Sequence, residues 1–152
     1  MMTNRPYSAA LERLRGAGLR PTRQRLALTR LLYSDGDRHV TAESLHKEAM
    51  AARVRVSLAT VYNTLHQFTM AGLLRQVVVD STRSYFDTNT SHHHHFFCEE
   101  NQRLVDIPGD AIRVENLPAP PDGTAVNRID VVVRVRPTDL EDGGSRVRVS
   151  AN

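Results

Sequence analysis

Four consecutive histidines, His92 to His95, are the residues whose type and spacing most clearly offer chemistry in this chain. If the run is an extended strand, its side chains alternate between two faces, so that His93 and His95 share one face and His92 and His94 the other. Two imidazoles on one face, joined by carboxylates from elsewhere, form a mixed nitrogen and oxygen site that suits Fe²⁺, Mn²⁺ or Zn²⁺. The donor types alone do not select one of these ions.

The histidine run lies where the charge of the chain changes sign. Residues 1–91 carry 13 basic and 7 acidic side chains, a net charge of +6, whereas residues 92–152 carry 7 basic and 10 acidic ones, a net charge of −3. This asymmetry indicates a polyanion-binding module followed by a module that titrates or binds metal.

Length and composition limit the class of protein. A chain of 152 residues allows one domain or two small ones, and its single cysteine, Cys98, excludes an intramolecular disulfide framework. No apolar run approaches the roughly 20 residues of a membrane span, and the first residues lack the apolar stretch of a signal peptide. We therefore expect a cytoplasmic protein.

The basic half is predicted to be a winged helix-turn-helix domain over residues 1–91. Four short helices are expected, with N-terminal capping residues Ser8, Thr22, Thr41 and Ser57, and Gly72 follows the fourth helix as its stop signal. Two segments rich in β-formers, 74–79 and 84–88, then flank a polar tip and predict a hairpin. Helices followed directly by such a hairpin are typical of this fold.

The second half is predicted to be a small α/β domain over residues 92–137, so the chain belongs to the α+β class. Strands are expected at about 94–98, 103–107 and 126–136, with a short helical or irregular piece near 110–116 and a Pro-rich turn over 117–123. Residues 138–152 are polar and weakly patterned, which predicts a flexible tail.

Polar side chains of the fourth helix could reach DNA. Thr60, Tyr62 and Asn63 have the size and polarity to contact base edges in a major groove. Arginines around the second helix and at the hairpin tip could contact the phosphate backbone, although any arginine-rich chain also has solvated arginines. These arginines are Arg15, Arg20, Arg23, Arg25 and Arg83.

Several longer motifs resemble the Fur family of metal-responsive repressors. They are residues 19–25 (LRPTRQR), 39–45 (HVTAESL), 56–65 (VSLATVYNTL) and 85–87 (YFD), together with the histidine run, and the resemblance extends from about residue 8 to 136. It implies a winged helix followed by an α/β dimerisation domain, and a homodimer or higher oligomer on palindromic operator DNA. It also implies that Tyr62 contacts bases.

The resemblance further implies one regulatory metal site. Its ligands would be His39, Asp87, His93, His95 and Asp106. The first two belong to the DNA-binding half and the others to the second half, so an ion held by all five would fix the angle between the halves. Alternatively, His39 is a surface loop histidine and Asp106 a solvated residue at a strand end.

Departures from the family pattern indicate which further metal sites of the family this chain lacks. The paired cysteines of a structural zinc site are missing, so we expect that site to be absent and Cys98 to be a small core residue on a strand. Arg113 and Arg128 stand where some members have ligands of a further metal site.

These features are similar to those of the haem-responsive iron response regulators within the family, which implies haem bound by His92, His93 or His94. No Cys-Pro haem motif is present. The alternative is a peroxide- or manganese-sensing repressor that uses the five ligands without haem.

A hydrolytic metalloenzyme is the competing class of function. It would require an open coordination position and a nearby acid or base, but the sequence has no HExxH motif, no phosphate-binding glycine loop and no spacing typical of a catalytic triad. We therefore expect a regulator of transcription rather than an enzyme.

Overall fold

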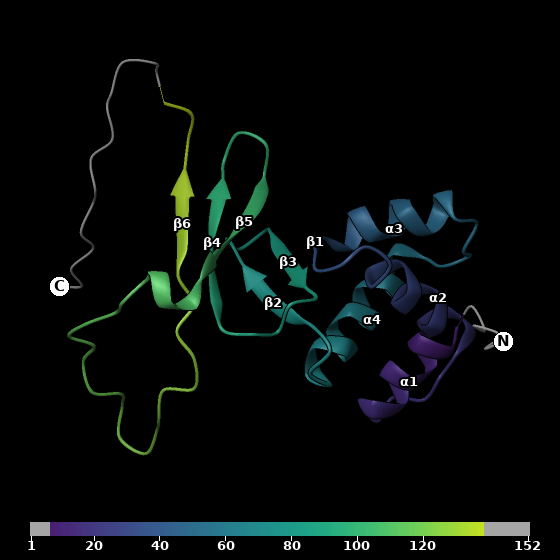
Figure 1. Cartoon of the computed structure of the whole chain (residues 1–152), viewed down its shortest axis with the longest axis horizontal. Helices are drawn as coiled ribbons and strands as arrows, with labels where there is room; N and C mark the ends of the chain where they lie inside the picture. Colours follow the sequence, from purple (N-terminus) through teal and green to yellow (C-terminus); the bar gives the residue numbers. More distant parts are fainter. Residues whose placement is uncertain (1–6, 139–152) are drawn as a thin grey trace, which may run out of the picture. The chain divides into compact units, whose positions relative to one another are not determined.

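The computed structural model describes residues 7–138, and the chain divides between Thr90 and Ser91 into two compact units (Figure 1). The first unit contains four helices and a small sheet, and the second contains a three-stranded sheet. The predicted α+β class is therefore confirmed. Apart from Thr138, the predicted tail lies outside the described residues.

The helices of the first unit pack their apolar faces into one core. Its largest fully buried side chains include Phe68, Phe86 and Leu65, which come from the fourth helix and the sheet. The helices are α1 (Ser8–Gly16), α2 (Arg23–Leu32), α3 (Ala42–Ala51) and α4 (Leu58–Met70).

Three of the four predicted helix caps are confirmed. The hydroxyls of Thr22, Thr41 and Ser57 accept hydrogen bonds from backbone N–H groups in the first turns of α2, α3 and α4. The prediction for Ser8 is wrong, because the Leu11 N–H donates to the Tyr7 carbonyl at 2.8 Å and thereby starts the helical bonding one residue earlier. Tyr7 is the N-cap residue and gives no side-chain cap.

The sheet of the first unit contains the predicted hairpin and one additional strand. The hairpin strands β2 (Arg75–Val78) and β3 (Ser84–Asp87) are antiparallel, and β1 (His39–Val40) pairs with the other edge of β3. A two-residue strand leaves no periodic signal in a sequence, so β1 was not among the predicted elements. It places His39 directly opposite Asp87.

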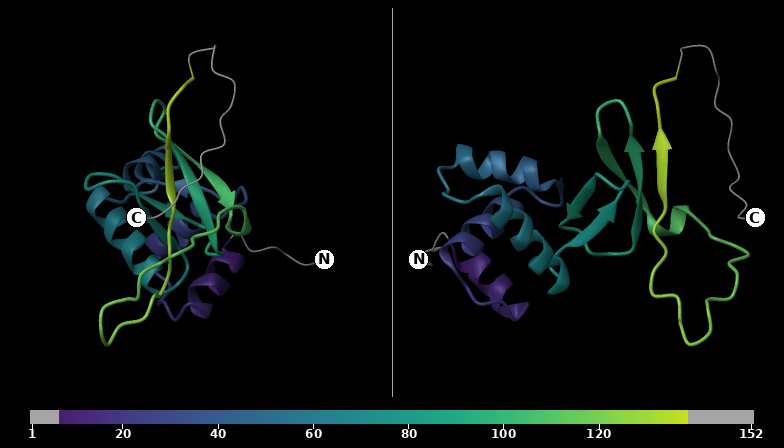
Figure 2. Two further views of the ribbon diagram at one scale, coloured as in Figure 1. Left: turned by 90° about the vertical axis from the view of Figure 1, so that its left-hand side faces the viewer. Right: turned by 180° about the vertical axis from the view of Figure 1, so that it is seen from behind.

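The second unit is built around β4 (His93–Cys98). It pairs antiparallel with β5 (Arg103–Pro108) on one edge and parallel with β6 (Val132–Val135) on the other. The short helical or irregular piece expected near 110–116 is the 3₁₀ turn η1 (Gly109–Ala111), after which the chain runs irregularly to β6 (Figure 2). The predicted strand 126–136 is confirmed only over 132–135.

β6 begins later than predicted, at Val132, and the cause lies at Val131. Its carbonyl still accepts from the His95 N–H at 3.1 Å, but its own N–H donates to the His94 side chain instead of a backbone carbonyl of β4. The strand ladder therefore stops there.

No helix in the described part of the chain is long and apolar enough to cross a membrane.

The close approach of Gly109 to His92 yields a prediction about stability. A Cβ at Gly109 would lie 2.4 Å from Cδ2 of His92 and 2.7 Å from its carbonyl oxygen. We expect Gly109→Ala to lower the free energy of unfolding of the second unit by about 1–3 kcal/mol, because the close packing must open. Amide hydrogen exchange of β4 measures this change.

Gly16→Ala is the matched control for Gly109→Ala. Nothing lies within 4 Å of the position of its Cβ, and Gly16 is the last residue of α1. This variant should leave the exchange of β4 unchanged. If the β4 amides exchange equally fast in the two variants, the close contact between Gly109 and His92 contributes nothing to the stability of the second unit.

Candidate metal centre and nucleic-acid interface

His92 lies just before β4 and the other three histidines lie on it, and the four rings divide between two faces as the strand period predicts. The rings of His93 and His95 lie 4.5 Å apart on one face, and the rings of His92 and His94 lie 5.0 Å apart on the other. His93, His94 and His95 are buried, whereas His92 is exposed. The two pairs therefore occupy different environments.

A backbone hydrogen bond fixes the tautomer of His93. Nδ1 of His93 lies 2.7 Å from the carbonyl oxygen of Ser91. Because a carbonyl only accepts, Nδ1 carries the proton, and the neutral ring presents the Nε2 lone pair on its other side. Metal-binding histidines are commonly oriented by such an outer hydrogen bond.

Asp106 on β5 completes a three-residue group within the second unit. It lies opposite His95 in the strand register, and its Oδ1 is 3.3 Å from Nε2 of His95 and 3.6 Å from Nε2 of His93. The ligand atoms of the three residues all lie within 4.8 Å of one another. Two imidazoles and one carboxylate in such a cluster suit a divalent transition metal.

His39 and Asp87 form a second group, within the first unit. Nε2 of His39 is 3.2 Å from Oδ2 of Asp87, and Asp87 is only 1% exposed. The other carboxylate oxygen, Oδ1, accepts the Asn89 N–H at 2.9 Å. One carboxylate oxygen thus holds the turn after β3, and the other faces the imidazole.

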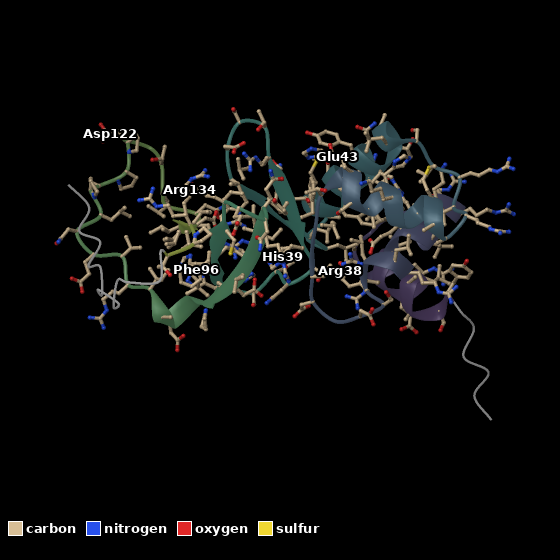
Figure 3. The ribbon with its side chains drawn as sticks, turned by 90° about the horizontal axis from the view of Figure 1, so that it is seen from above. Arg38, His39, Glu43, Phe96, Asp122 and Arg134 are labelled. Atoms are coloured by element: carbon tan, nitrogen blue, oxygen red, sulfur yellow. The ribbon has the colours of Figure 1, made fainter. Side chains whose placement is uncertain are left out.

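Arg38 and Thr88, the neighbours of this pair, fix its position. The Thr88 N–H donates to the Arg38 carbonyl at 3.1 Å, and the Arg38 N–H donates to the Thr88 hydroxyl at 2.9 Å. Arg38 and His39 lie together where the chain enters β1 (Figure 3). The β1–β3 pairing is thus extended by one residue beyond the ligand candidates.

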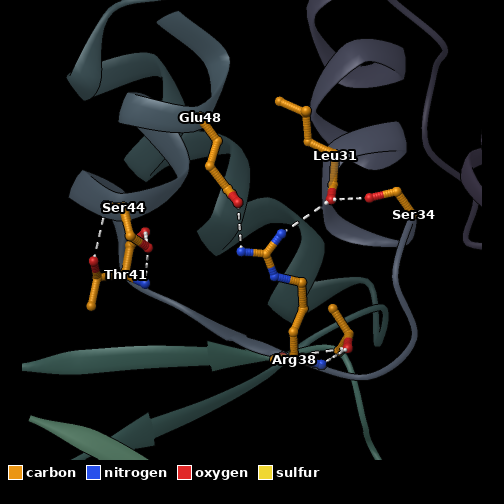
Figure 4. Close-up of polar contacts among 7 residues, drawn as sticks. Leu31, Ser34, Arg38, Thr41, Ser44 and Glu48 are labelled. Carbon is orange, nitrogen blue, oxygen red and sulfur yellow. Dashed lines mark hydrogen bonds and ion pairs between the residues drawn. The ribbon is translucent and has the colours of Figure 1, made fainter. Parts of the chain in front are cut away.

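The guanidinium of Arg38 connects this segment to two helices. It donates to Oε1 of Glu48 on α3 at 2.8 Å and to the Leu31 carbonyl of α2 at 3.4 Å (Figure 4). Sequence reasoning missed Arg38 and Thr88, and only their positions next to His39 and Asp87 could have indicated them. It also missed Arg75, which is 4% exposed and lies opposite Asp87 in the register of β2 and β3.

His94 has a structural contact that its place in the histidine run did not reveal. Its Nδ1 accepts the Val131 N–H at 3.1 Å, and the residue is 2% exposed. The proton of the neutral ring is therefore on Nε2. His94 thus holds the start of β6 to β4.

The predicted base-contacting residues of α4 differ in exposure. Tyr62 is 49% exposed and Asn63 is also exposed, so both side chains are accessible. Thr60 is half-buried, and its hydroxyl accepts a hydrogen bond from Ser57 at 2.9 Å within the helix cap. The ring of His66 packs edge-on against Tyr62, with 4.5 Å between the ring centroids, and supports it.

The predicted backbone-contacting arginines also fall into two groups. Arg15, Arg20 and Arg23 are exposed. Arg25 is engaged within the unit, because its guanidinium donates to the Arg20 carbonyl at 2.8 Å and to Oε1 of Gln67 on α4 at 2.9 Å. Arg25 therefore links two parts of the unit, the segment that contains Arg20 and the helix α4.

Arg83 lies at the tip of the hairpin beside an acidic turn residue. Its Nε is 3.4 Å from Oδ2 of Asp80. Hydrogen bonds from the backbone N–H and the hydroxyl of Thr82 hold the pKa of Asp80 below its ordinary value. The carboxylate thus remains charged and organises the turn that carries Arg83.

The model of the Ferric uptake regulator family matches residues 16–131, which is most of the chain. This chain belongs to the Ferric uptake regulator family. The family resemblance expected from the sequence is thereby confirmed, whereas the narrower resemblance to the iron response regulators stays a prediction.

Curated relatives and solved structures agree with this membership. The peroxide-responsive repressor PerR of Staphylococcus aureus is 35% identical over 93 residues, which are 61% of this chain and 62% of the relative. The matched region thus spans about three fifths of that relative. The ferric uptake regulator of Pseudomonas aeruginosa, solved with manganese, is 28% identical, with a TM-score of 0.66 over 86% of this chain and 98% of that one.

The ferric uptake regulator of Francisella tularensis, solved with iron, shares the fold. It is 21% identical, with a TM-score of 0.65 over 78% of this chain and 92% of that one.

Three residues at which the sequence departs from the family pattern are placed as follows. Cys98 ends β4, where it is half-buried rather than fully in the core. Arg113 and Arg128 are exposed, and each pairs with a carboxylate two residues further on, Glu115 at 3.4 Å and Asp130 at 2.9 Å.

The hydrogen bond to His94 yields the second prediction. We expect His94→Leu to lower the free energy of unfolding of the second unit by about 1 kcal/mol, because the half-buried Val131 N–H loses its acceptor. The Val131 amide should also exchange faster with solvent, which NMR measures directly.

His94→Asn is the control for this variant. The amide oxygen of asparagine can replace Nδ1 as the acceptor, so exchange at Val131 should stay slow. If leucine and asparagine have the same effect, the fastening role of His94 is wrong.

Proposed function

We propose that this chain is a metal-dependent transcriptional repressor that binds operator DNA as a homodimer. The observation that carries the proposal is the group of His93, His95 and Asp106, in which a backbone hydrogen bond directs Nε2 of His93 toward the same carboxylate oxygen that faces His95. Nothing in ordinary packing requires two buried imidazoles to converge on one carboxylate oxygen.

The proposed ion takes ligands from both units. His93, His95 and Asp106 supply two nitrogens and a carboxylate, and His39 and Asp87 supply one further nitrogen and a second carboxylate. Neutral imidazoles and ionised carboxylates are the ligand forms that such an ion requires. An ion shared by two units biases their relative orientation, and in a dimer this sets the separation of the two recognition helices.

The first unit supplies the DNA contacts in this proposal. Its net charge of +6 attracts the duplex, the exposed Arg15, Arg20 and Arg23 contact phosphates, and Tyr62 and Asn63 reach base edges in the major groove. A two-fold symmetric dimer would bind a palindromic operator, because each subunit reads one half-site.

A response to peroxide is the best-supported finer function. The Staphylococcus aureus relative is named a peroxide-responsive repressor. A peroxide response requires a redox-active ion, and two imidazoles with a carboxylate form a ligand set that Fe²⁺ accepts. A manganese response uses the same ligands, in line with the manganese-bound Pseudomonas aeruginosa structure.

A haem response has weaker support from the residues proposed to bind haem. It would require His92, His93 or His94 as axial ligands, but His93 belongs to the metal-facing group and His94 fastens β6. Of the three, His92 alone is exposed. Haem bound by His93 would therefore compete with metal, and haem bound by His94 would displace a structural contact, so His92 is the accessible ligand.

The metal proposal is tested by titrating Mn²⁺ into the wild type and the His93→Ala variant. Loss of this ligand should weaken Mn²⁺ binding at least about tenfold, because loss of even an outer-shell partner costs that much. Binding of a duplex selected from genomic fragments should then require correspondingly more Mn²⁺, as measured by fluorescence anisotropy.

His92→Ala is the matched control, since it removes an exposed imidazole from the opposite face of the histidine run. Its Mn²⁺ affinity should match that of the wild type. Equal weakening in the two variants would contradict the assignment of the metal face, and metal-independent operator binding would contradict the function.

The effector is identified by comparing protein loaded with Fe²⁺, with Zn²⁺ and with haem. Peroxide should release the Fe²⁺-loaded protein from its operator and leave the Zn²⁺-loaded protein bound, because zinc has no redox chemistry. Release of both forms would contradict an iron-based response. A Soret shift that is lost in His92→Ala, together with haem-dependent release, would instead support the haem reading.

A further inference from the structure

A pocket of about 560 Å³ lies on the first unit, and none of the proposed metal ligands lines it. It is lined by the start of α2 and by residues 52–55, the turn between α3 and α4, together with Tyr7. Leu26, Ala27 and Val54 provide apolar walls. Of the lining residues, Arg23 alone belongs to the predicted DNA-contacting set, and none is a proposed metal ligand.

Three arginines surround the pocket, and no acidic residue is among the described residues that line it. Arg23 comes from α2, and Arg53 and Arg55 come from the turn. All three are exposed. Guanidinium groups bind phosphate oxygens in paired hydrogen bonds, and apolar walls strengthen such contacts by excluding water.

The turn that carries two of these arginines is firmly held. The Val54 N–H donates to the Ala49 carbonyl at 2.8 Å, and the Arg53 N–H donates to the Met50 carbonyl at 3.1 Å, which together close α3. The Gln24 side chain donates to the Arg55 carbonyl at 3.3 Å. The position of the turn against α2 is therefore fixed before any ligand binds.

Arg53 adopts a backbone conformation that favours glycine. Its φ is 59°, in the left-handed region, at the position that ends a helix and where glycine is the usual residue. A side chain with a Cβ at this position costs folding free energy that glycine would not. Residues in such conformations cluster at binding sites.

We propose that Arg23, Arg53 and Arg55 form a socket for one phosphate group of the DNA backbone. The inference rests on the proposed DNA-binding function and extends the contact surface to the turn between α3 and α4. In helix-turn-helix proteins the first helix crosses the backbone while the second enters the major groove, which favours a backbone phosphate over a free one. Arg23 is itself a predicted backbone contact and lies three residues from Arg20, another one.

The socket is tested by the salt dependence of duplex binding. Each neutralised phosphate contributes about 0.9 to the slope of log affinity against log salt concentration. The double variant Arg53→Gln/Arg55→Gln should reduce the magnitude of the slope by about one. It should weaken the binding of operator and random duplex by the same factor, since a phosphate contact carries no sequence information.

Two further variants control for folding and for charge. Arg53→Gly relieves the backbone conformation, so it should fold at least as well as the wild type and still show part of the loss. Lys47→Gln removes an exposed cation from α3 outside the pocket and should leave the slope unchanged.

An unchanged slope in the double variant would overturn the proposal. A second result would also overturn it: inorganic phosphate or pyrophosphate shifts the NMR signals of Arg53 and Arg55, but the double variant binds duplex as the wild type does. The pocket would then bind a free phosphate compound. Random duplex tests the socket even if metal-dependent operator binding fails. The two failures are therefore distinguishable.

Discussion

The two-residue period of β4 is the constraint on which the second unit depends. It directs His93 and His95 toward Asp106, and His94 toward the backbone of Val131. A shift of one residue in the pairing of β4 would exchange the two faces and disrupt both groups. The same short strand thus presents the proposed metal ligands on one side and holds its neighbouring strand with the other.

In the first unit, the ligand candidates depend on residues that bind no metal themselves. The β1–β3 pairing places His39 opposite Asp87, and the hydrogen bonds between Arg38 and Thr88 extend that pairing. The Arg38 guanidinium then reaches Glu48 on α3, the helix that precedes α4. The position of His39 is therefore connected to the helical framework that presents Tyr62.

Local signals explain why much of the fold could be predicted from the sequence. Caps such as Thr41 and Ser57, the stop at Gly72 and the period of the histidine run each act within a few residues, and the sequence shows them directly. The prediction for Ser8 failed because candidate capping residues do not fix a helix start to one position.

Contacts between distant residues could not be predicted in the same way. Arg38 meets Thr88 across 50 positions and His94 meets Val131 across 37, and neither pair leaves a mark in the sequence. The strand expected over 126–136 shortened to four residues because one of these contacts diverts the Val131 N–H. The resemblance to the family suggested the five ligand candidates, but not the hydrogen bonds that orient them.

The connectivity of the second unit also implies an order of folding. The strands β4 and β5 are joined by residues 99–102 alone, so their hairpin closes a small loop and can form within microseconds. The pairing of β6 with β4 is parallel and must first close the long irregular connection, which costs more chain entropy and favours late formation. His93, His95 and Asp106 would accordingly be organised on a nascent hairpin, and the His94 face would be completed when the last strand docks.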